Sequence, residues 1–256
     1  MNVPVFMYHH VLPKKGFITS SVEEFEDQMK YLSENGYKTL TSEEFYLYKL
    51  GKLKVPKKSV MITFDDGWRD NFVYAYPILK KYNLKATLFI VTNWIEESSK
   101  RKNKAGEFQP LNHGKCKTEI AIYPERVVLN WDDLEKMSDV FDYHSHTHTH
   151  RDFYFKKCGW EEEFELSRKI IRDRLGFYDK HLCWPKGFYE EDLIKIAKNY
   201  NFEIFYTVER GLNPPNKKLD HIKRIAAKKD AKWLHKTLSI FSNDIAGSLY
   251  SLIKPR

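Results

Sequence analysis

Short apolar segments alternate with amphipathic segments along nearly the whole chain, and this alternation most constrains the fold. Residues 3–8, 60–64 and 86–91 are apolar runs of strand length. Ser21 and Glu24 form a capping-box pattern, which predicts that a helix begins between two such runs. Regular alternation of strands and helices favours a parallel α/β architecture, either a barrel or a doubly wound sheet.

The length of 256 residues suits one α/β domain with a substantial core. No internal repeat or domain boundary is visible, so we predict a single domain over residues 1–256. The alternation is interrupted at about 96–118, where Lys, Glu, Asn and Gly dominate. We interpret this segment as a surface insertion, and its basic cluster at 100–104 as a candidate peripheral contact with a lipid-linked glycan.

Charge and composition narrow the range of partners and compartments. The chain has 43 Lys and Arg against 35 Asp and Glu, a net charge of +8, which suits a polysaccharide, a lipid-linked sugar phosphate or a membrane surface. We expect no nucleic-acid partner. The three cysteines form no CxxC pair, so neither a cysteine zinc site nor a disulfide framework is indicated. No run approaches the length of a transmembrane helix and no signal peptide is visible, so we expect a cytoplasmic protein.

Polar residues follow several predicted strands at the point where each strand ends. His9 follows the first strand, Asp65 and Asp66 follow the run 60–64, and Lys186 follows a later strand end. In parallel α/β folds, chemistry gathers at the carboxyl ends of strands. We therefore expect these side chains to converge on one edge of the sheet.

Asp65 and Asp66 are adjacent carboxylates at the end of a hydrophobic strand. Their mutual repulsion near a core requires a cation or a shared proton. Adjacent side chains diverge, so one can ligate a metal while its neighbour faces a bound water. Gly67 permits a tight turn after them.

The segment 144–150 holds four histidines in seven residues: His144, His146, His148 and His150. On a strand all four would share one face, whereas in a helical turn residues i and i+4 pair, which selects 146 with 150 or 144 with 148. Two imidazoles with one carboxylate are typical of a catalytic zinc site, although cobalt, nickel and iron accept similar ligands.

These two segments resemble the motifs of the polysaccharide deacetylase family, which has the NodB homology domain and is also called carbohydrate esterase family 4. The first motif, TFDDG, stands at 63–67, and the second, SHTxxH, at 145–150. The resemblance covers most of residues 3–240. It implies a distorted (β/α) barrel, in agreement with the polar strand ends.

The resemblance also implies roles for individual residues. Asp66, His146 and His150 would bind a divalent metal, with zinc expected, and Asp65 would be the general base. A divalent metal lowers the pKa of bound water to about 7 in favourable sites and polarises the amide carbonyl.

The third motif departs from the family pattern. The family's arginine, which orients the base, is replaced by Cys183, and its tyrosine by Lys186. Arg224 could supply the missing arginine from a later strand. We group Trp184, Lys186 and Arg224 as substrate-binding candidates, with the flat indole facing a pyranose ring.

The proton donor is expected from the N-terminal strand. The opening Tyr-His-His segment resembles the poly-N-acetylglucosamine deacetylase branch, in which the catalytic histidine comes from this strand. We assign His9 as the acid, because imidazole titrates near neutrality. His10 is then either turned outward toward substrate or structural.

The predicted function is therefore metal-dependent removal of N-acetyl groups from GlcNAc-type sugars of a glycan or glycolipid. Two alternatives stay open. One is an O-acetyl esterase on the same scaffold. The other is a sugar-binding pseudoenzyme, which the altered third motif favours.

Overall fold

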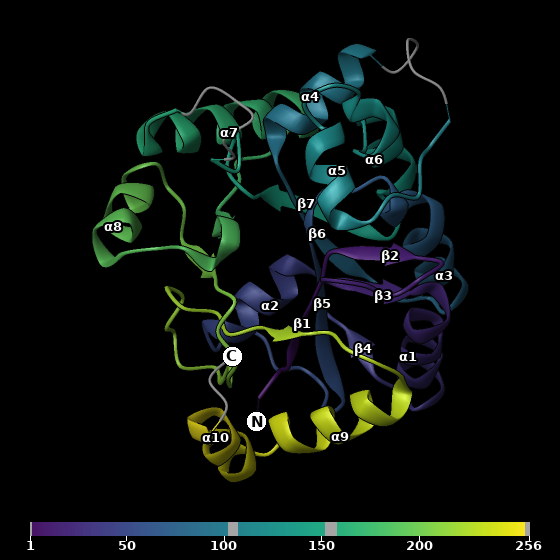
Figure 1. The fold of residues 1–256 in the computed structure, drawn as a ribbon. Helices are drawn as coiled ribbons and strands as arrows, with labels where there is room; N and C mark the ends of the chain where they lie inside the picture. The colour runs from purple at the N-terminus through teal and green to yellow at the C-terminus, as the bar shows by residue number, and fades with distance from the viewer. Residues whose placement is uncertain (1, 102–106, 152–157, 254–256) are drawn as a thin grey trace.

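A curved sheet of parallel strands forms the centre of the protein, and helices pack around it (Figure 1). The computed structural model describes residues 2–101, 107–151 and 158–253. The strands are β1 (Val5–Tyr8), β2 (His10–Leu12), β3 (Thr19–Ser21), β4 (Lys38–Thr39), β5 (Ser59–Asp66), β6 (Ala86–Ile90), β7 (Phe141–Ser145), β8 (His181–Cys183), β9 (Ile204–Tyr206) and β10 (Ile225–Ala226).

Helices connect and follow the strands, and the longest of those described, at Trp160–Leu175, is α7. They are α1 (Val22–Glu34), α2 (Ser42–Lys49), α3 (Tyr76–Lys81), α4 (Thr92–Arg101), α5 (His113–Glu119), α6 (Trp131–Met137), α7 (Trp160–Leu175), α8 (Glu191–Asn199), α9 (Ala231–Phe241) and α10 (Asp244–Ile253). A π-helical turn at Asn71–Ala75 precedes α3, and short 3₁₀ turns occur at Pro124–Arg126 and Pro185–Gly187.

The main sheet has the order β10-β1-β5-β6-β7-β8-β9, with β4 paired to β5, and its neighbouring strands are parallel. Its two edges approach each other, because Tyr206 at the end of β9 forms a parallel bridge with Ile222, three residues before β10 begins. The sheet therefore curls into a distorted barrel, and the predicted fold class is confirmed.

The strand register aligns the carboxyl ends of the central strands. Tyr8 pairs with Phe64, Asp66 with Ile90, and Ile90 with Ser145. The residues that follow these strands consequently lie at one edge of the barrel. This alignment brings segments separated by more than a hundred residues into one site.

Local sequence signals explain where the early helices begin. In α1 the Ser21 side chain accepts a hydrogen bond from the Glu24 amide, and the Glu24 carboxylate reaches back to the Ser21 amide. Thr41 and Glu44 repeat this capping box at α2. Each box satisfies two backbone donors that a helix start would otherwise leave unpaired.

The segment 96–118 differs from the irregular surface insertion that its composition suggested. Helix α4 continues through Arg101, and α5 covers most of 113–118. Each helix buries one side chain of this segment: Ser98 of α4 and Cys116 of α5 are at most 2% exposed. The described part of the segment is thus largely helical, but among its residues only Ser98 and Cys116 are buried; Lys102 and Lys104 of its basic cluster lie outside the described residues.

The barrel is filled by large side chains on its inner face. Met61, Phe89, Cys183 and Tyr206 are fully buried and belong to one hydrophobic cluster. Phe89 and Tyr206 are in ring contact, with centroids 4.7 Å apart. This packed interior supports the polar carboxyl edge above it. Within the described residues, none of the helices combines the length and apolar composition that crossing a bilayer requires.

Candidate active site and metal centre

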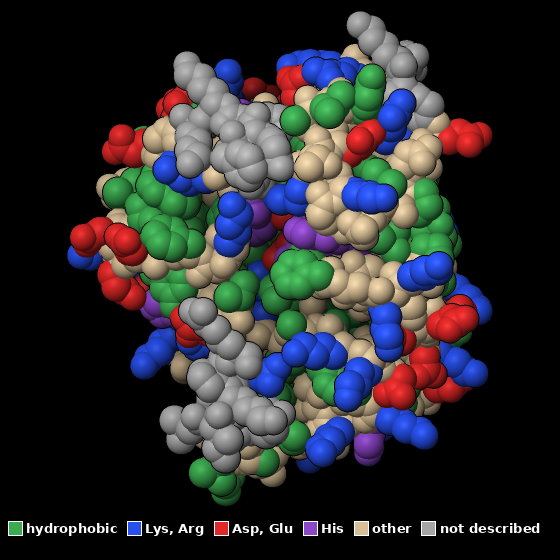
Figure 2. Space-filling model, viewed as in Figure 1, with side chains coloured by type: hydrophobic (Ala, Val, Ile, Leu, Met, Phe, Trp, Pro, Cys, Tyr) green, Lys and Arg blue, Asp and Glu red, His purple; other side chains and the backbone are tan. Residues whose placement is uncertain are grey.

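A cavity of about 320 Å³ opens at the carboxyl edge of the barrel. Figure 2 shows histidine side chains at the floor of a hollow near the centre of the face, with hydrophobic and Lys or Arg side chains around it. The cavity is lined by Met7, His9, Phe17, Ile18, Asp65, Asp66, His113, Lys117, His146, His150, Trp184, Lys186 and Val208.

A larger cavity of about 940 Å³ lies elsewhere, beside β7 and the end of α7. It is lined by Ser42, His144 and His181 among others, and by none of the predicted metal ligands. Size alone therefore does not mark the site, and the convergence of ligand-type side chains identifies the smaller cavity.

Asp66, His146 and His150 converge on one point. The Nε2 atoms of both histidines lie 3.4 Å from Oδ1 of Asp66. That oxygen is buried and has no hydrogen-bond donor among the described residues. Two imidazole nitrogens and one unsatisfied carboxylate oxygen fit a divalent metal with positions open for other ligands.

Neighbouring groups orient these three side chains. The indole Nε1 of Trp68 donates to Oδ2 of Asp66 at 2.9 Å, which turns Oδ1 toward the histidines. Nδ1 of His146 lies 2.8 Å from the carbonyl oxygen of Cys183, to which it donates. The proton on Nδ1 leaves the lone pair of His146 on Nε2, as metal binding requires.

The backbone at the end of β5 adopts a left-handed conformation. Asp66 has φ 79° and Gly67 has φ 91°. A Cβ atom on Gly67 would lie 3.1 Å from Cδ1 of Ile95. A non-glycine residue held at positive φ costs about 1–3 kcal/mol, and such residues cluster at functional sites.

The histidine segment does not form the helical turn that we considered from its spacing. Residues 146–150 make an irregular turn in which Thr147 has φ 67° and His150 has φ 58°. Glu163 of α7, fully buried, accepts hydrogen bonds from the amides of His148 and Thr149 and from the Thr149 hydroxyl. The turn is thus fixed from outside by one carboxylate.

The other two histidines of the segment point elsewhere. His144 is hydrogen-bonded to Asp179 through Nδ1 and to Ser42 through Nε2, each at 2.7 Å, and it lines the other, larger cavity. Nδ1 of His148 lies 2.9 Å from the hydroxyl of Thr92. The tertiary structure therefore selects the pair 146 and 150.

Asp65 is held by a buried arginine that immediately precedes β10. Arg224 donates from Nη1 to Oδ1 at 2.6 Å and from Nη2 to Oδ2 at 2.8 Å. Its Nε donates to the carbonyl oxygen of Thr207 at 2.7 Å. Burial alone would raise the pKa of Asp65, but the guanidinium of Arg224 and the imidazoles of His146 and His9 together outweigh burial, and the pKa lies below its usual value.

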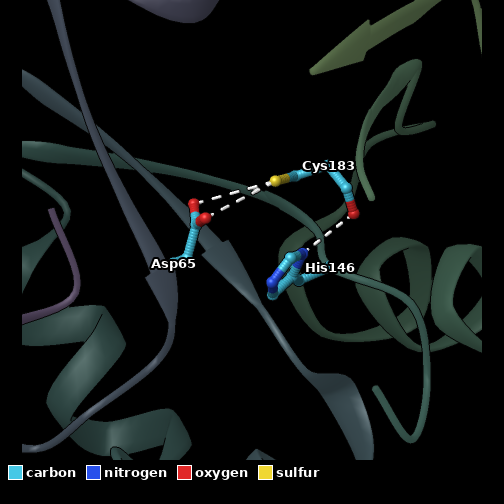
Figure 3. A group of neighbouring side chains, drawn as sticks. All are labelled: Asp65, His146 and Cys183. Carbon is cyan, nitrogen blue, oxygen red and sulfur yellow. Dashed lines mark hydrogen bonds between the residues drawn. The ribbon is translucent and has the colours of Figure 1, made fainter. Parts of the chain in front are cut away.

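Cys183 occupies the position of the family's arginine and also touches Asp65. Figure 3 shows its thiol pointing toward the carboxylate, with Sγ 3.7 Å from each oxygen. Asp65, His146 and Cys183 are close enough to form a second candidate metal group. The group fits a cation poorly, because the positive guanidinium of Arg224 already occupies both oxygens of Asp65.

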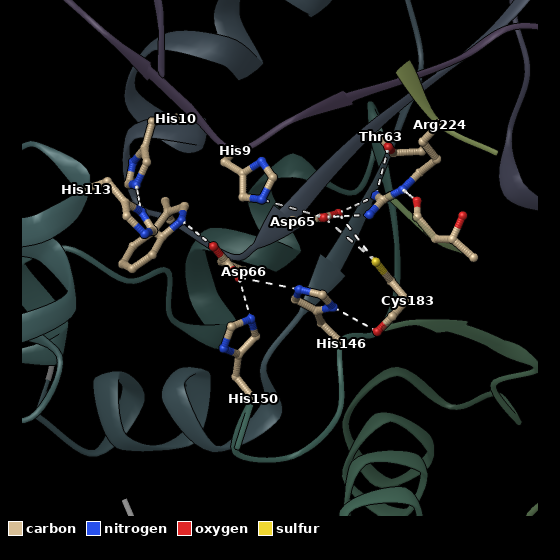
Figure 4. A network of polar contacts seen from close by, with 12 residues as sticks. His9, His10, Thr63, Asp65, Asp66, His113, His146, His150, Cys183 and Arg224 are labelled. Carbon is tan, nitrogen blue, oxygen red and sulfur yellow. Dashed lines mark hydrogen bonds and ion pairs between the residues drawn. The ribbon is translucent and has the colours of Figure 1, made fainter. Parts of the chain in front are cut away.

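His9 and His10 separate into two environments, as Figure 4 shows. Nε2 of His9 lies 3.7 Å from Oδ2 of Asp65, and the ring lines the cavity. Burial lowers the pKa of His9, although Asp65 and Asp66 oppose the shift. His10 is fully buried and bound to Asp70, so its assignment to substrate binding is corrected: it has no surface on the cavity.

The remaining substrate-binding candidates lie in different positions. Lys186 lines the cavity and has φ 58°. Trp184 also lines it but is fully buried, and its ring stacks on Phe205 with centroids 5.7 Å apart, so it is not an open platform for a sugar ring. Arg224 does not line the cavity, because Asp65 covers it. The prediction that Arg224 binds substrate is therefore corrected. Its contact with Asp65 instead fits the other role we considered, that of replacing the arginine missing from the third motif.

Four residues near the site were not singled out from the sequence. Trp68 is adjacent to the first motif, so its position beside Asp66 had a local signal. Phe17, 77% exposed, lies in a loop, and His113 and Lys117 lie on α5. No local pattern connected these three with motifs so distant in the chain.

A parallel barrel with a two-histidine, one-aspartate group at its carboxyl edge defines the class of this chain, a barrel of the polysaccharide-deacetylase type. The model of the family described as polysaccharide deacetylase matches residues 52–205, more than half of the chain. The chain therefore belongs to the polysaccharide deacetylase family.

Individual relatives agree with this membership. The chain is 29% identical over 223 residues to poly-beta-1,6-N-acetyl-D-glucosamine N-deacetylase of Staphylococcus epidermidis, covering 82% of this chain and 68% of that protein. This chain spans about two thirds of the length of the curated relatives that it matches. Among solved structures, it is similar to the Streptococcus pyogenes deacetylase PplD in complex with acetate (TM-score 0.75, 22% identity, 93% of this chain and 98% of that one). IcaB from Ammonifex degensii shares the fold as well (TM-score 0.73, 21% identity, 94% and 97%).

Proposed function

We propose that this protein hydrolyses the N-acetyl group of a GlcNAc-type residue in a glycan. The observation that carries the proposal is the separation of two adjacent carboxylates into two environments. Oδ1 of Asp66 faces two imidazoles and has no hydrogen-bond donor among the described residues, whereas Asp65 is clamped by Arg224. The names of relatives that act on poly-beta-1,6-N-acetyl-D-glucosamine support the sugar class.

Zinc is the metal that we propose for Asp66, His146 and His150, since borderline imidazole ligands with one carboxylate suit it. When bound, such a metal supplies an acidified water and polarises the carbonyl of the scissile amide. The protein fixes the ligand set through Trp68 and the Cys183 carbonyl.

Asp65 is the proposed general base. It lies at the cavity wall beside the metal ligands, and its two bonds from Arg224 fix the direction of its oxygens. His9 is the proposed proton donor to the leaving amine, because its ring lines the cavity and Nε2 approaches Asp65. Both groups line the same cavity, one to take a proton and one to deliver it.

The O-acetyl esterase alternative uses the same residues, and a panel of N-acetylated and O-acetylated sugars separates the two reactions. The pseudoenzyme alternative rested on the missing arginine of the third motif. The Arg224 clamp supports an enzyme, since the base has an orienting partner from another strand.

The decisive variant is Asp65→Asn, which keeps the shape of the side chain and removes its basicity. We expect acetate release from N-acetylglucosamine oligomers to fall at least a hundredfold, in the range attributed to a general base, while one metal ion per chain remains bound. Asp192→Asn, at a carboxylate whose side chain is 85% exposed, is the matched control and should keep full activity. Full activity of the Asp65 variant would refute the base assignment.

A further inference from the structure

A chain of three polar side chains runs from the core to the cavity behind the metal centre. Oδ2 of Asp70 lies 2.7 Å from Nδ1 of His10, and Nε2 of His10 lies 3.2 Å from Nδ1 of His113. Figure 4 shows the two imidazoles beside each other on the Asp66 side of the site. This series of hydrogen bonds joins Asp70, which follows β5, to His113 on α5 through His10 of β2.

The first member of this chain is held in one orientation. Oδ1 of Asp70 accepts hydrogen bonds from the amide of Val11 at 2.8 Å and from the Asn71 side chain at 3.0 Å. Both partners are N–H donors, so Oδ1 must be the acceptor there. Oδ2 is then directed at His10, which is fully buried and stacks on Trp68 with centroids 4.6 Å apart.

The last member reaches the substrate side. His113 lines the cavity together with Asp66 and His150, and its ring packs edge-on against Trp68. Its Nδ1 is bonded to the buried His10, so the opposite edge of the ring, which carries Nε2, is left for the cavity. Phe17 at the rim packs against the same ring, with centroids 5.7 Å apart.

We propose that His113 determines sugar specificity by accepting a hydrogen bond, at Nε2, from a hydroxyl or amide N–H of the substrate, and that Asp70 and His10 are positioning residues that fix its tautomer. This inference rests on the proposed function for the identity of the ligand. The hydrogen-bond chain itself is independent of that function.

The direction of the chain follows from the inventory of donors and acceptors. A neutral imidazole has one donor and one acceptor nitrogen. The Asp70 carboxylate accepts from Nδ1–H of His10, so Nε2 of His10 carries a lone pair and accepts from Nδ1–H of His113. Nε2 of His113 then carries a lone pair as well. Burial lowers the pKa of His113 to about 4, which keeps this imidazole neutral near pH 7.

The substitution Asp70→Asn should reverse every bond in the chain. The Asn oxygen must stay toward the Val11 amide and the Asn71 side chain, so its NH₂ group faces His10. That donor requires a lone pair on Nδ1 of His10, and both histidines must then switch tautomers. His113 would present an N–H donor to the cavity in place of an acceptor.

Tautomers can be observed directly by ¹⁵N NMR of the metal-loaded protein labelled at histidine. We expect an unprotonated Nε2 for His113 in the native sequence and a protonated Nε2 in D70N. Loss of one signal set in His113→Gln assigns the resonance. A protonated Nε2 in the native sequence would overturn the proposal, as would an unchanged tautomer in folded D70N.

Kinetics on N-acetylglucosamine oligomers tests the role in binding. His113→Leu should raise KM about tenfold, as expected for one lost hydrogen bond, with kcat changed less than threefold and metal stoichiometry unchanged. His113→Gln, whose oxygen can replace Nε2, should recover part of the loss, and D70N should resemble H113L. His235→Gln, at an exposed histidine on α9, is the control.

Together, the NMR and kinetic experiments distinguish failure of the His113 proposal from failure of the proposed function. An active native enzyme whose KM is unchanged in H113L refutes the specificity role. A native protein that binds metal and releases no acetate refutes the proposed function instead, and the NMR arm still decides the tautomer. If D70N does not fold, H113L and H113Q, which alter the partly exposed end of the chain, still decide the role of His113.

Discussion

Arg224 binds both carboxylate oxygens of Asp65 from a segment 159 residues later in the chain. Both side chains are nearly inaccessible, at 0% and 2% exposure. A carboxylate that is fully removed from water requires such a partner, since an unpaired buried charge is strongly unfavourable. The pair therefore links the orientation of the proposed base to the stability of the barrel.

Replacing Arg224 by Met should lower the free energy of unfolding by about 3–5 kcal/mol, because it leaves Asp65 buried without a counter-charge. Chemical denaturation measures this change. The double variant D65N/R224M should recover much of the stability, since the uncompensated charge at position 65 is gone, but no activity, since the proposed base is also gone. Arg174→Met, which removes a half-exposed pair with Glu96, should cost less than about 1 kcal/mol. Equal losses in R174M and R224M would contradict the buried-pair explanation.

Replacing Trp68 by Phe should weaken metal binding about 10–100-fold, because the substitution removes the indole N–H that orients Asp66. Isothermal titration with zinc measures the affinity. Trp94→Phe, at a neighbouring tryptophan that is equally buried, controls for lost packing. If both variants lose the same affinity, the hydrogen bond is not the cause.

Replacing Glu163 by Gln should loosen the turn that carries His150. One oxygen of Glu163 accepts two backbone amides and the other accepts the Thr149 hydroxyl, and an amide cannot accept at both positions. We expect a loss of about 1–3 kcal/mol in the free energy of unfolding of the metal-free protein, together with weaker zinc binding. Glu162→Gln, one residue earlier and exposed, should change neither quantity.

Replacing Gly187 by Ala should destabilise the turn after β8. Gly187 has φ 67°, and a Cβ atom there would lie 2.2 Å from Cγ2 of Val208. The positive φ alone costs about 1–3 kcal/mol for a non-glycine residue, and the close contact adds to it. Gly159→Ala is the matched control, because its φ is −63° and a Cβ atom there would meet no other atom within 4 Å, so its effect should stay within about 0.5 kcal/mol. Thermal unfolding of both variants compares the two positions.

Much of the fold followed from periodicity and capping patterns. The apolar runs became β1, β5 and β6, and the Ser21 capping box begins α1 at the expected residue. The segment 96–118 was interpreted less well, because its helices are polar on their outer faces and bury only a few side chains, such as Ser98 and Cys116. Such helices resemble loops in composition.

The candidate site, like the fold, was predictable from the sequence only in part. Two short motifs contain Asp65, Asp66, His146 and His150. The order and spacing of these motifs indicate the chemistry of the four residues without knowledge of the fold. The spacing of the histidines left two pairings open, however. The choice depends on an irregular turn anchored by Glu163, which no helical or strand periodicity describes.

The sequence by itself determined the class of fold, the ligand types and the identity of the adjacent carboxylates, because these depend on local periodicity and side-chain chemistry. Only the tertiary structure decided that Arg224 clamps Asp65, that His10 turns inward to Asp70, and that His113 reaches the cavity. These relationships depend on the parallel register of β1, β5 and β7 and on the packing of α5 beside Trp68. Such contacts join residues far apart in the chain, and their energy exists only once the intervening core has formed.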